Sequence, residues 1–416
     1  MSTEFANVSV IGLGYIGLPT AAILATHGVP VIGVDINQMA VDTINAGKIH
    51  IVEPELEAVV SGVVTAGKLR ATTKPEAADA YIIAVPTPFK GDHEPDLGYV
   101  EAASKSIAPL LKKGDLVILE STSPVGTTEQ MTAWLAAARP DLTFPTLGGD
   151  AADIFVVYCP ERVLPGRVLH ELVENDRIIG GMTPACAERA SALYYTFLRG
   201  KCLLSDPRTA EMAKLTENAF RDVNIAFANE LSLIAERLSI NVWDLIDLAN
   251  RHPRVNILQP GPGVGGHCIA VDPWFIVHKT PDLARMIHTA RKVNDEKPHY
   301  VIHRVEEHAK RFSKPVIACL GLAYKPDIDD LRESPSMEIA EHLAQKQLGE
   351  LLIVEPHVTA LPKSLAKYPG VEFASFQAAV QRADIVLLLV NHRQFRNVDR
   401  RLLMEKIVID TRGMWR

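Results

Sequence analysis

Long hydrophobic runs are absent from this sequence. The apolar run nearest the C-terminus, Ile385–Val390, is far shorter than the roughly 20 residues that a membrane-spanning helix needs. Near the N-terminus, Val8–Leu13 follow no cationic segment and run into glycines, so we expect a strand there rather than a signal peptide. We therefore expect no membrane partner.

Regularly spaced cysteines and clustered positive charges are also missing. The five cysteines form an odd set without regular spacing, which is typical of a reducing compartment rather than of a disulfide framework. The formal net charge is -7, and no run of lysines and arginines forms a basic patch, which argues against a general nucleic-acid binder. We expect a cytoplasmic protein that has no nucleic-acid partner.

The apolar residues lie in short runs separated by helix-length connections. The chain of 416 residues exceeds one ordinary core, since domains hold roughly 100–200 residues. Runs at Val8–Ile11, Val29–Val34, Ala80–Val85 and Leu116–Leu119 predict strands. Strands this apolar, joined by helices, indicate a parallel sheet covered on both faces, as in a doubly wound, Rossmann-like α/β domain.

Glycine and proline are absent from Thr209 to His252, although the chain uses both freely elsewhere. Asp206 and Thr209 are candidate starts of a helix of about 30 residues. Asn241 is a candidate cap of a second helix after a short break. A helix of this length is typical of a connector between domains, and we expect it to form a homodimer interface as well.

The C-terminal part of the chain repeats the pattern of the first domain. Val316–Leu320, Leu351–Val354 and Ile385–Val390 predict strands of a second Rossmann-like domain. Its turn at Gly321 lacks a triple-glycine pattern, so this domain should hold a different nucleotide in a different way. The expected organisation is a Rossmann-like domain over residues 1–205, a central helical domain over 206–300 and a smaller Rossmann-like domain over 301–416.

A glycine-rich turn joins the first predicted strand to the first predicted helix. Gly12–Gly17 (GLGYIG) has the spacing in which Gly12 permits a tight turn, Gly14 admits a pyrophosphate and Gly17 lets the helix pack on the strand. Asp35 ends the next strand, where its carboxylate can accept hydrogen bonds from an adenosine ribose and repel a 2′-phosphate. The pattern favours NAD over NADP as the cofactor.

A polar stripe lies on the predicted long helix. Glu211, Lys214, Asn218 and Arg221 are spaced for one helical face. Such charges usually form a solvated face. The neighbouring stretch Val223–Glu230 is largely apolar or small, however, which would turn the stripe toward a cavity, where a lysine beside an asparagine can stabilise an oxyanion or hold a water.

The stretch Gly261–Trp274 (GPGVGGHCIAVDPW) places four glycines just before His267 and Cys268. No C-x-x-C or H-x-x-x-H motif includes this pair, so we predict no metal, and no Gly-Lys-Ser/Thr closes a phosphate loop. A buried, inert cysteine is the ordinary alternative. We expect the glycines to clear space beside the sulfur, so that Cys268 is a nucleophile for aldehyde oxidation through a thiohemiacetal and a thioester.

Together these motifs resemble those of the nucleotide-sugar 6-dehydrogenases, the family that includes UDP-glucose dehydrogenase. The resemblance covers essentially the whole chain and is carried by Val10–Pro19, Ala84–Pro95, Tyr158–Arg162, Glu211–Asn218, Gly261–Trp274 and Lys325–Ser334. It implies that a C6 alcohol of a UDP-sugar is oxidised twice, with two NAD reduced, to a uronic acid. It also implies a place in surface polysaccharide biosynthesis.

The resemblance implies a role for individual residues. Cys268 corresponds to the nucleophile, Lys214 to the acid/base or oxyanion partner, and Glu161 to the glutamate associated with water activation. The other catalytic candidates are Asn218, Asp272 and Thr122. The candidate NAD contacts, besides the three glycines, are Tyr15, Ile16, Asp35, Thr87, Thr128 and Arg332. The candidate substrate contacts are Arg162, Val163, Lys214, Asn218, Arg221, His252, Arg254, Gly265, Tyr324, Lys325 and Arg412.

One departure from the UDP-glucose branch narrows the substrate. That branch usually carries a lysine-aspartate pair just after the cysteine, whereas this chain has Ala270 and Val271 before Asp272. The form resembles the branch that acts on 2-acetamido sugars, so the expected substrate is UDP-N-acetyl-D-mannosamine, with UDP-N-acetylglucosamine or UDP-glucose as alternatives. The competing functions are a two-electron dehydrogenase of the 2-hydroxy acid or 6-phosphogluconate type and a non-catalytic nucleotide-sugar sensor.

Overall fold

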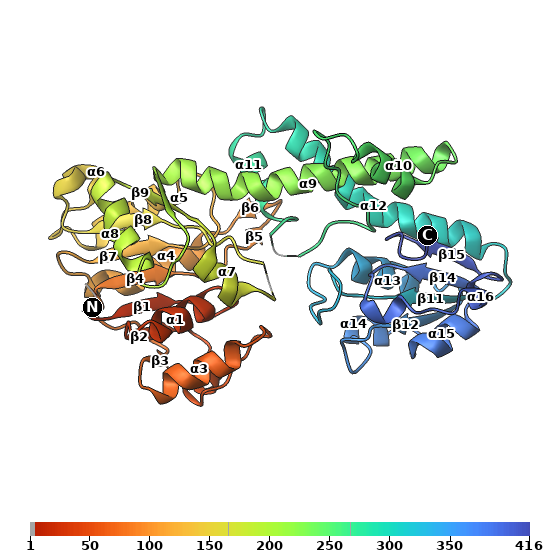
Figure 1. Ribbon diagram of the computed structural model, residues 1–416, viewed down its shortest axis with the longest axis horizontal. Coiled ribbons are helices and arrows are strands. Elements are labelled where there is room, and N and C mark those ends of the chain that lie inside the picture. Colours follow the sequence, from red (N-terminus) through yellow and green to blue (C-terminus); the bar gives the residue numbers. More distant parts are fainter. Residues whose placement is uncertain (1–4, 165, 267) are drawn as a thin grey trace. The chain divides into compact units, whose positions relative to one another are not determined.

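Two compact units make up the fold, and each contains a sheet flanked by helices (Figure 1). The computed structural model describes residues 5–164, 166–266 and 268–416, so His267 of the glycine-rich loop lies outside the described residues. The first unit extends to Thr216, and the second runs from Glu217 to Arg416. The boundary between them falls inside one long helix.

The first unit is built on a sheet whose strands are ordered β10-β9-β8-β7-β4-β1-β2-β3. They are β1 (Val8–Ile11), β2 (Val31–Val34), β3 (Leu69–Thr72), β4 (Ala80–Ile83), β7 (Leu116–Leu119), β8 (Phe155–Tyr158), β9 (Arg177–Gly181) and β10 (Cys202–Ser205), with a small hairpin of β5 (Phe89–Lys90) and β6 (Glu94–Pro95) beside them. The predicted parallel sheet is confirmed for the predicted strands β1, β2, β4 and β7, and the parallel pairing extends to β3 and β8. β9, which was not among the predicted strands, pairs with β8 in the antiparallel direction, and reversed strands at one edge are common in such sheets.

Consecutive residues of the central strands supply two hydrophobic layers. Val10 joins the cluster on one face of the sheet, whereas Ile11 joins the cluster on the other. Because both faces are covered, these strands are apolar at nearly every position. The covering helices are α1 (Gly17–Thr26), α2 (Gln38–Asn45), α3 (Leu56–Thr65), α4 (Gly98–Ile107), α5 (Thr127–Ala138), α6 (Pro145–Gly148), α7 (Val168–Glu174) and α8 (Pro184–Tyr194).

The predicted long helix is confirmed as α9 (Pro207–Arg237), which has 31 residues. Asp206 accepts hydrogen bonds from the amide and the hydroxyl of Thr209 at its start. Asn241 caps α10 (Val242–Ala249), as predicted, by accepting bonds from two amides of its first turn. Over the described residues, no helix is long and apolar enough to cross a membrane.

The second unit carries a parallel sheet ordered β13-β12-β11-β14-β15 over its described residues. This order reproduces β3-β2-β1-β4-β7 of the first unit, which confirms the second Rossmann-like sheet. The strands are β11 (Val316–Leu320), β12 (Glu350–Val354), β13 (Val371–Phe373), β14 (Ile385–Leu388) and β15 (Ile407–Asp410). The helices that follow α10 are α11 (Asp272–Lys279), α12 (Arg285–Ala309), α13 (Pro335–Lys346), α14 (Lys363–Ala366), α15 (Phe376–Arg382) and α16 (Arg400–Leu403).

Candidate active site

The three glycines between β1 and α1 differ in what a side chain would meet. A Cβ on Gly12 would lie 2.6 Å from the carbonyl oxygen of Ala84, and one on Gly17 would collide with the carbonyl of Gly12. A Cβ on Gly14 would meet nothing within 4 Å. Packing therefore requires the outer two glycines, whereas Gly14 leaves open the space in which a pyrophosphate would approach the helix N-terminus.

The carboxylate of Asp35 faces this turn from the end of β2. Its Oδ2 accepts a 3.0 Å hydrogen bond from the amide of Leu13, and its Oδ1 accepts a 2.9 Å bond from the amide of Asn37. A carboxylate offers about four acceptor positions, so Asp35 retains capacity for the hydroxyls of a ribose. The open glycine turn and this carboxylate fit an NAD molecule, with the pyrophosphate at the turn and the adenosine ribose at Asp35.

The other predicted NAD contacts of the first unit differ in exposure. Tyr15 is exposed and Ile16 is half-buried, whereas Thr128 is fully buried. The hydroxyl of Thr87 donates a 2.6 Å bond to the carbonyl oxygen of Thr122. This bond joins the loops that follow β4 and β7, two neighbouring strands whose carboxyl ends meet at the same edge of the sheet.

Glu211 caps α5, a role that its place in the predicted polar stripe does not indicate. Its Oε1 accepts bonds from the amide and the hydroxyl of Thr128, at 2.8 and 2.7 Å, and its Oε2 accepts a 2.6 Å bond from the amide of Gly126. The fully buried carboxylate therefore meets the unpaired amides and the positive dipole end of this helix. These partners are 83 and 85 residues away in the chain, so no local pattern indicates the cap.

Lys214 and Glu161 are electrostatically coupled within the first unit. Desolvation raises the pKa of Glu161 to about 8, and the positive charge of Lys214 opposes this shift. Lys214 itself is buried on α9. Glu161 accepts a hydrogen bond from the amide of Val163, and Arg162 donates to the carbonyl oxygen of Asp176. The segment after β8 therefore carries Glu161 and the predicted substrate contacts Arg162 and Val163, and Lys214 lies on α9.

Asn218 and Asp272 meet within the second unit. The side-chain amide of Asn218 donates a 2.6 Å bond to Oδ2 of Asp272, and both residues are buried. Asp272 begins α11, so the bond links α9 to the helix that follows the glycine-rich loop. The predicted polar stripe is buried from Glu211 to Asn218, whereas Arg221 is exposed. For Arg221, the alternative of a solvated helix face is therefore correct.

Two further asparagines of α9 hold the start of the glycine-rich loop. Asn224 accepts a 2.9 Å bond from the amide of Leu258 and donates one of 2.9 Å to the carbonyl oxygen of Asn256. Asn229 accepts a 2.9 Å bond from the amide of Gly261. Both positions stand out in the sequence as polar residues within an apolar stretch, but the sequence alone does not indicate their partners.

A buried polar network supports Asn229 from α12. Asn229 donates to Asn294 at 2.8 Å, and Asn294 donates to the carboxylate of Asp222 at 2.8 Å. Arg291 donates to the same carboxylate at 2.6 Å, and both members of this ion pair are fully buried. Burial raises the pKa of Asp222 to about 6, against the opposing charge of Arg291. Loss of one member of such a pair leaves an uncompensated buried charge, so the network fixes α9 against α12.

The loop glycines pack against protein, which corrects the expectation that they clear space beside a ligand. A Cβ on Gly261 would lie 2.6 Å from the guanidinium group of Arg412, and one on Gly266 would lie 2.9 Å from the ring of Tyr324. A Cβ on Gly265 would collide with the backbone that precedes α13. Glycine is required here because the loop and its neighbours approach too closely for any side chain. The same packing places three predicted substrate contacts, Gly265, Tyr324 and Arg412, around the loop.

Cys268 is exposed, so the alternative of a buried, inert cysteine is wrong for this thiol. Its carbonyl oxygen accepts bonds from the amides of Val271 and Asp272, at 3.0 and 2.8 Å, which form a turn leading into α11. The predicted substrate contacts His252 and Arg254 are exposed as well. The amide of Arg254 donates to Nδ1 of His252 at 3.3 Å.

The remaining predicted contacts lie in the segment after β11 and at the end of the chain. Tyr324 and Lys325 are half-buried, with the lysine Nζ 5.8 Å from the centre of the tyrosine ring. Arg332, a predicted NAD contact, is exposed and pairs with Asp330 through two hydrogen bonds of 2.9 and 2.8 Å. Desolvation lowers the pKa of Arg412 to about 10, so this guanidinium remains a cation at neutral pH.

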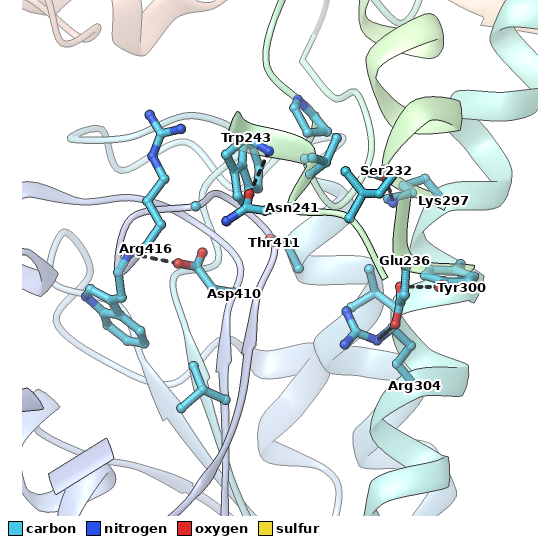
Figure 2. Close-up of a pocket in the computed structure, with 18 residues that line it drawn as sticks. Ser232, Glu236, Asn241, Trp243, Lys297, Tyr300, Arg304, Asp410, Thr411 and Arg416 are labelled. Atoms are coloured by element: carbon cyan, nitrogen blue, oxygen red, sulfur yellow. Dashed lines mark hydrogen bonds and ion pairs between the residues drawn. The ribbon is translucent and has the colours of Figure 1, made fainter. Parts of the chain in front are cut away.

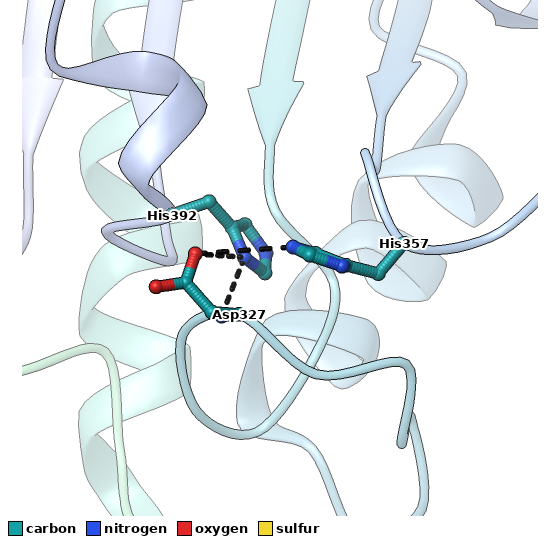
Figure 3. A group of neighbouring side chains, drawn as sticks. All are labelled: Asp327, His357 and His392. Atoms are coloured by element: carbon teal, nitrogen blue, oxygen red, sulfur yellow. Dashed lines mark hydrogen bonds and ion pairs between the residues drawn. The ribbon is translucent and has the colours of Figure 1, made fainter. Parts of the chain in front are cut away.

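Three neighbouring side chains, Asp327, His357 and His392, lie at the segment that follows β11 (Figure 3). Within the described residues, Asp327, His357 and His392 bring their ligand atoms within 4.8 Å of one another, close enough to hold a metal ion. However, Nδ1 of His392 accepts a 2.9 Å bond from the amide of Asp327, and its Nε2 lies 3.1 Å from the carboxylate of Glu355. Arg393 pairs with Asp327 at 2.9 Å. These bonds already use the His392 nitrogens and the Asp327 carboxylate that a metal would need. We therefore interpret the three side chains as holding the segment after β11 in place.

Glu355 directly follows β12, at the position that matches Asp35 after β2 in the first unit. Each accepts a bond from the amide after its turn glycine, Glu355 from Leu322 at 2.7 Å. Glu355 is 2% exposed and also bonds His392, whereas Asp35 is partly open to solvent. The carboxylate of Glu355 is therefore already bonded within its own domain, which agrees with the expectation that this domain holds its nucleotide in a different way.

Three domains of one known family match successive parts of the chain. Residues 6–198 match the NAD binding domain of the UDP-glucose/GDP-mannose dehydrogenase family, residues 208–296 match its central domain, and residues 318–416 match its UDP binding domain.

Individual relatives are similar over nearly their full length. The NDP-N-acetyl-D-galactosaminuronic acid dehydrogenase of Ralstonia nicotianae is 65% identical, covering 99% of this chain and 97% of the relative. The UDP-N-acetyl-D-mannosamine dehydrogenase of Yersinia pestis is 63% identical, covering 99% and 100%. Among solved structures, the UDP-D-ManNAc dehydrogenase of Pyrococcus horikoshii is 38% identical with a TM-score of 0.88, covering 99% of this chain and 96% of that one. The chain therefore belongs to the UDP-glucose/GDP-mannose dehydrogenase family and is an NAD-dependent nucleotide-sugar dehydrogenase.

Proposed function

We propose that this enzyme oxidises the C6 alcohol of UDP-N-acetyl-D-mannosamine to give UDP-N-acetyl-D-mannosaminuronate. The observation that carries the proposal is the full-length similarity to the Yersinia pestis protein named UDP-N-acetyl-D-mannosamine dehydrogenase. The residues after the nucleophile, Cys268–Pro273 (CIAVDP), add support, because they lack the lysine-aspartate pair of the UDP-glucose branch.

The proposed reaction consumes two NAD and one water. The alcohol loses a hydride and a proton to become an aldehyde, to which the thiol of Cys268 adds. The resulting thiohemiacetal loses a second hydride and a proton to become a thioester, and water then releases the uronic acid and restores the thiol. NAD, when bound, supplies the hydride acceptor for both oxidations. The exposure of Cys268 supports this role.

We assign the proton transfers to Lys214 and Glu161. A buried lysine can accept the proton of the alcohol or, as a cation, stabilise the thiohemiacetal oxyanion. Glu161, whose pKa is raised to about 8, would take a proton from the water that attacks the thioester. Asn218, Asp272 and Thr122 would position the reacting groups. Arg162, Arg221, His252, Arg254, Tyr324, Lys325 and Arg412, with Val163 and Gly265, remain the proposed substrate contacts.

The closest alternative substrate is a UDP-N-acetylgalactosamine-type sugar, because the 65% identical relative is named for N-acetyl-D-galactosaminuronic acid. UDP-N-acetylglucosamine and UDP-glucose are the other candidates. The test is to follow NADH formation with each of the four UDP-sugars. Two NADH per sugar, with the highest kcat/KM on the mannosamine derivative, would support the proposal. One NADH per sugar would refute the double oxidation, and a preference for another sugar would refute the substrate alone.

The proposed assembly is a homodimer formed through α9. Phe220, Phe227 and Ile234 are spaced by seven residues and are 66%, 51% and 46% exposed, so they form an apolar stripe on the helix. A cavity of about 440 Å³ beside the stripe is lined largely by apolar residues of α9 and α12. A second copy of the chain would cover both features. Light scattering should give the mass of a dimer for the native chain and of a monomer for Phe227→Glu; a native monomer would refute the proposal.

A further inference from the structure

A cavity of about 410 Å³ lies within the second unit, bordered by Pro260 and Gly261 of the glycine-rich loop (Figure 2). Its walls come from the end of α9, the turn into α10, α12, the end of β15 and the C-terminal residues. This volume falls in the range of about 300–1,000 Å³ that small-molecule sites occupy. Arg412, the proposed substrate contact, is not part of the lining, although both of its neighbours are.

One buried cation in this cavity, Lys297, has no carboxylate partner among the residues that the structure describes. Lys297 of α12 is 7% exposed, and its Nζ donates a 2.5 Å bond to the hydroxyl of Ser232. The same Nζ lies 5.1 Å from the centre of the Tyr300 ring. An ammonium group carries three donors, and within the described residues no carboxylate oxygen lies within 4.0 Å of this one. Charged groups are rarely buried without a counterion, because their desolvation costs several kcal/mol.

The two carboxylates that line the cavity, Glu236 and Asp410, already have other hydrogen-bond partners. Glu236 pairs with Arg304 at 2.9 Å and also accepts a bond from the hydroxyl of Tyr300. Asp410 accepts 2.9 Å bonds from the amides of Arg412 and Trp415. Two of the three cations in the lining are also paired, Arg304 with Glu236 and Arg416 with Asp247 at 2.9 Å. Lys297 is therefore the cation of the lining that pairs with no carboxylate among the described residues.

We propose that this cavity is a binding site for a small organic anion, whose carboxylate or phosphate group pairs with Lys297 while an apolar or planar body packs against Trp243 and Trp415. Neither the nucleotide-sugar nor NAD is assigned to this site. The ammonium group, which pairs with no carboxylate among the described residues, supplies the charge. The two tryptophans supply flat apolar surface in the same cavity.

A ligand in the cavity would contact the glycine-rich loop of the candidate active site. Gly261 lines the cavity and packs against Arg412. Thr411 and Gly413, on either side of Arg412, line it as well. An anion bound at Lys297 would therefore contact the backbone that positions this arginine. We expect it to change the KM for the nucleotide-sugar, a consequence that rests on the proposed function, whereas binding itself does not.

The first test measures binding on the full-length protein. Sodium phosphate, phenyl phosphate and benzoate are titrated while tryptophan fluorescence and heat are recorded, with sodium chloride at matched ionic strength as the control. The expected result is saturable binding of phenyl phosphate or benzoate, whichever carries the preferred head group. Phosphate alone should bind more weakly because it lacks a body for the tryptophans. Absence of saturable binding by all three probes would overturn the proposal.

Two variants locate the site at Lys297. Lys297→Met should weaken binding about tenfold or more, since it removes a charged hydrogen-bond donor. Lys292→Met changes an exposed lysine on the same helix and should leave binding unchanged. Should Lys297→Met fail to fold, Ser232→Asp is the second variant, because it places a carboxylate beside Lys297 that should compete with the ligand. Equal affinity of the native protein and either of these cavity variants would overturn the proposal.

Proton uptake gives an independent readout. Burial lowers the pKa of Lys297 to about 8, a shift that Arg304 reinforces and Glu236 opposes. A bound anion favours the charged form of the lysine. Binding of benzoate, which is itself fully ionised at both pH values, should therefore take up protons near pH 8 but not at pH 6, where the lysine is already charged. Calorimetry in two buffers of different ionisation enthalpy measures this uptake. The same uptake in Lys297→Met would overturn the assignment, and an unchanged sugar KM would remove only the link to activity.

Discussion

The side-chain amide of Asn218 donates a 2.6 Å hydrogen bond to the carboxylate of Asp272, and both groups are buried. This bond fixes the residue at which α11 begins, four positions after the proposed nucleophile Cys268. A short bond from a neutral amide to a buried carboxylate satisfies the charge without neutralising it. The proposed catalytic asparagine is therefore also a support for the nucleophile's segment.

Asn218→Ala should lower both stability and turnover. The substitution leaves the buried carboxylate of Asp272 without this donor, which costs about 1–3 kcal/mol. We expect a lower midpoint of thermal unfolding and a fall in kcat of roughly tenfold, measured by NADH formation. Thr216→Ala, at an exposed position of the same helix, is the matched control and should leave both quantities unchanged. Native kcat in Asn218→Ala would contradict the proposed role.

Cys268→Ser should abolish turnover while NAD binding survives. A hydroxyl is a far weaker nucleophile than a thiolate, so we expect kcat to fall on the order of a thousandfold or more. NAD affinity, measured by calorimetry, should stay at the native value. Cys202→Ser changes a half-buried cysteine outside the candidate site and serves as the control. A serine variant with native turnover would rule out the thioester route.

Glu161 should impose a pH dependence on thioester hydrolysis. Its pKa is raised to about 8 by desolvation, so the carboxyl is mostly protonated below that pH and becomes a base as the pH rises through it. The rate of hydrolysis should therefore increase about tenfold per pH unit below this pKa and level off above it. Glu161→Gln should lose this dependence and accumulate an acyl-enzyme on Cys268, detectable by intact-protein mass spectrometry. A native pH profile in Glu161→Gln would exclude this glutamate as the base.

Gly14→Ala and Gly17→Ala should fail in different ways. A Cβ on Gly14 meets nothing within 4 Å, so the midpoint of thermal unfolding of Gly14→Ala should equal that of the native protein. Its KM for NAD should rise about tenfold, because the methyl group enters the space for the pyrophosphate. A Cβ on Gly17 collides with the carbonyl of Gly12, so that variant should unfold at a lower temperature. Equal loss of stability in both variants would contradict the proposal that Gly14 leaves space for NAD whereas Gly17 is required for packing.

Local sequence patterns predict much of the fold because the responsible forces act over short distances in the chain. Apolar runs predict β1, β2, β4 and β7 of the first sheet and β11, β12 and β14 of the second, and the absence of glycine and proline predicts α9. Asp206 and Asn241 predict helix starts, since a cap bonds amides two or three residues away. The antiparallel pairing of β9 was not predicted, because strand direction depends on how the chain crosses the sheet.

The sequence by itself determined the family, the cofactor and the chemical types of the candidate residues, because motifs and spacing are properties of the chain alone. Only the tertiary structure decided what those residues touch. It turned Glu211 from a member of a polar stripe into the cap of α5, and it showed that Gly266 makes room for Tyr324 rather than for open space. It also left Lys297 buried with no carboxylate partner in the part of the chain that the structure describes. Contacts of this kind join residues distant in the chain, and packing, which no local pattern encodes, sets which donor meets which acceptor.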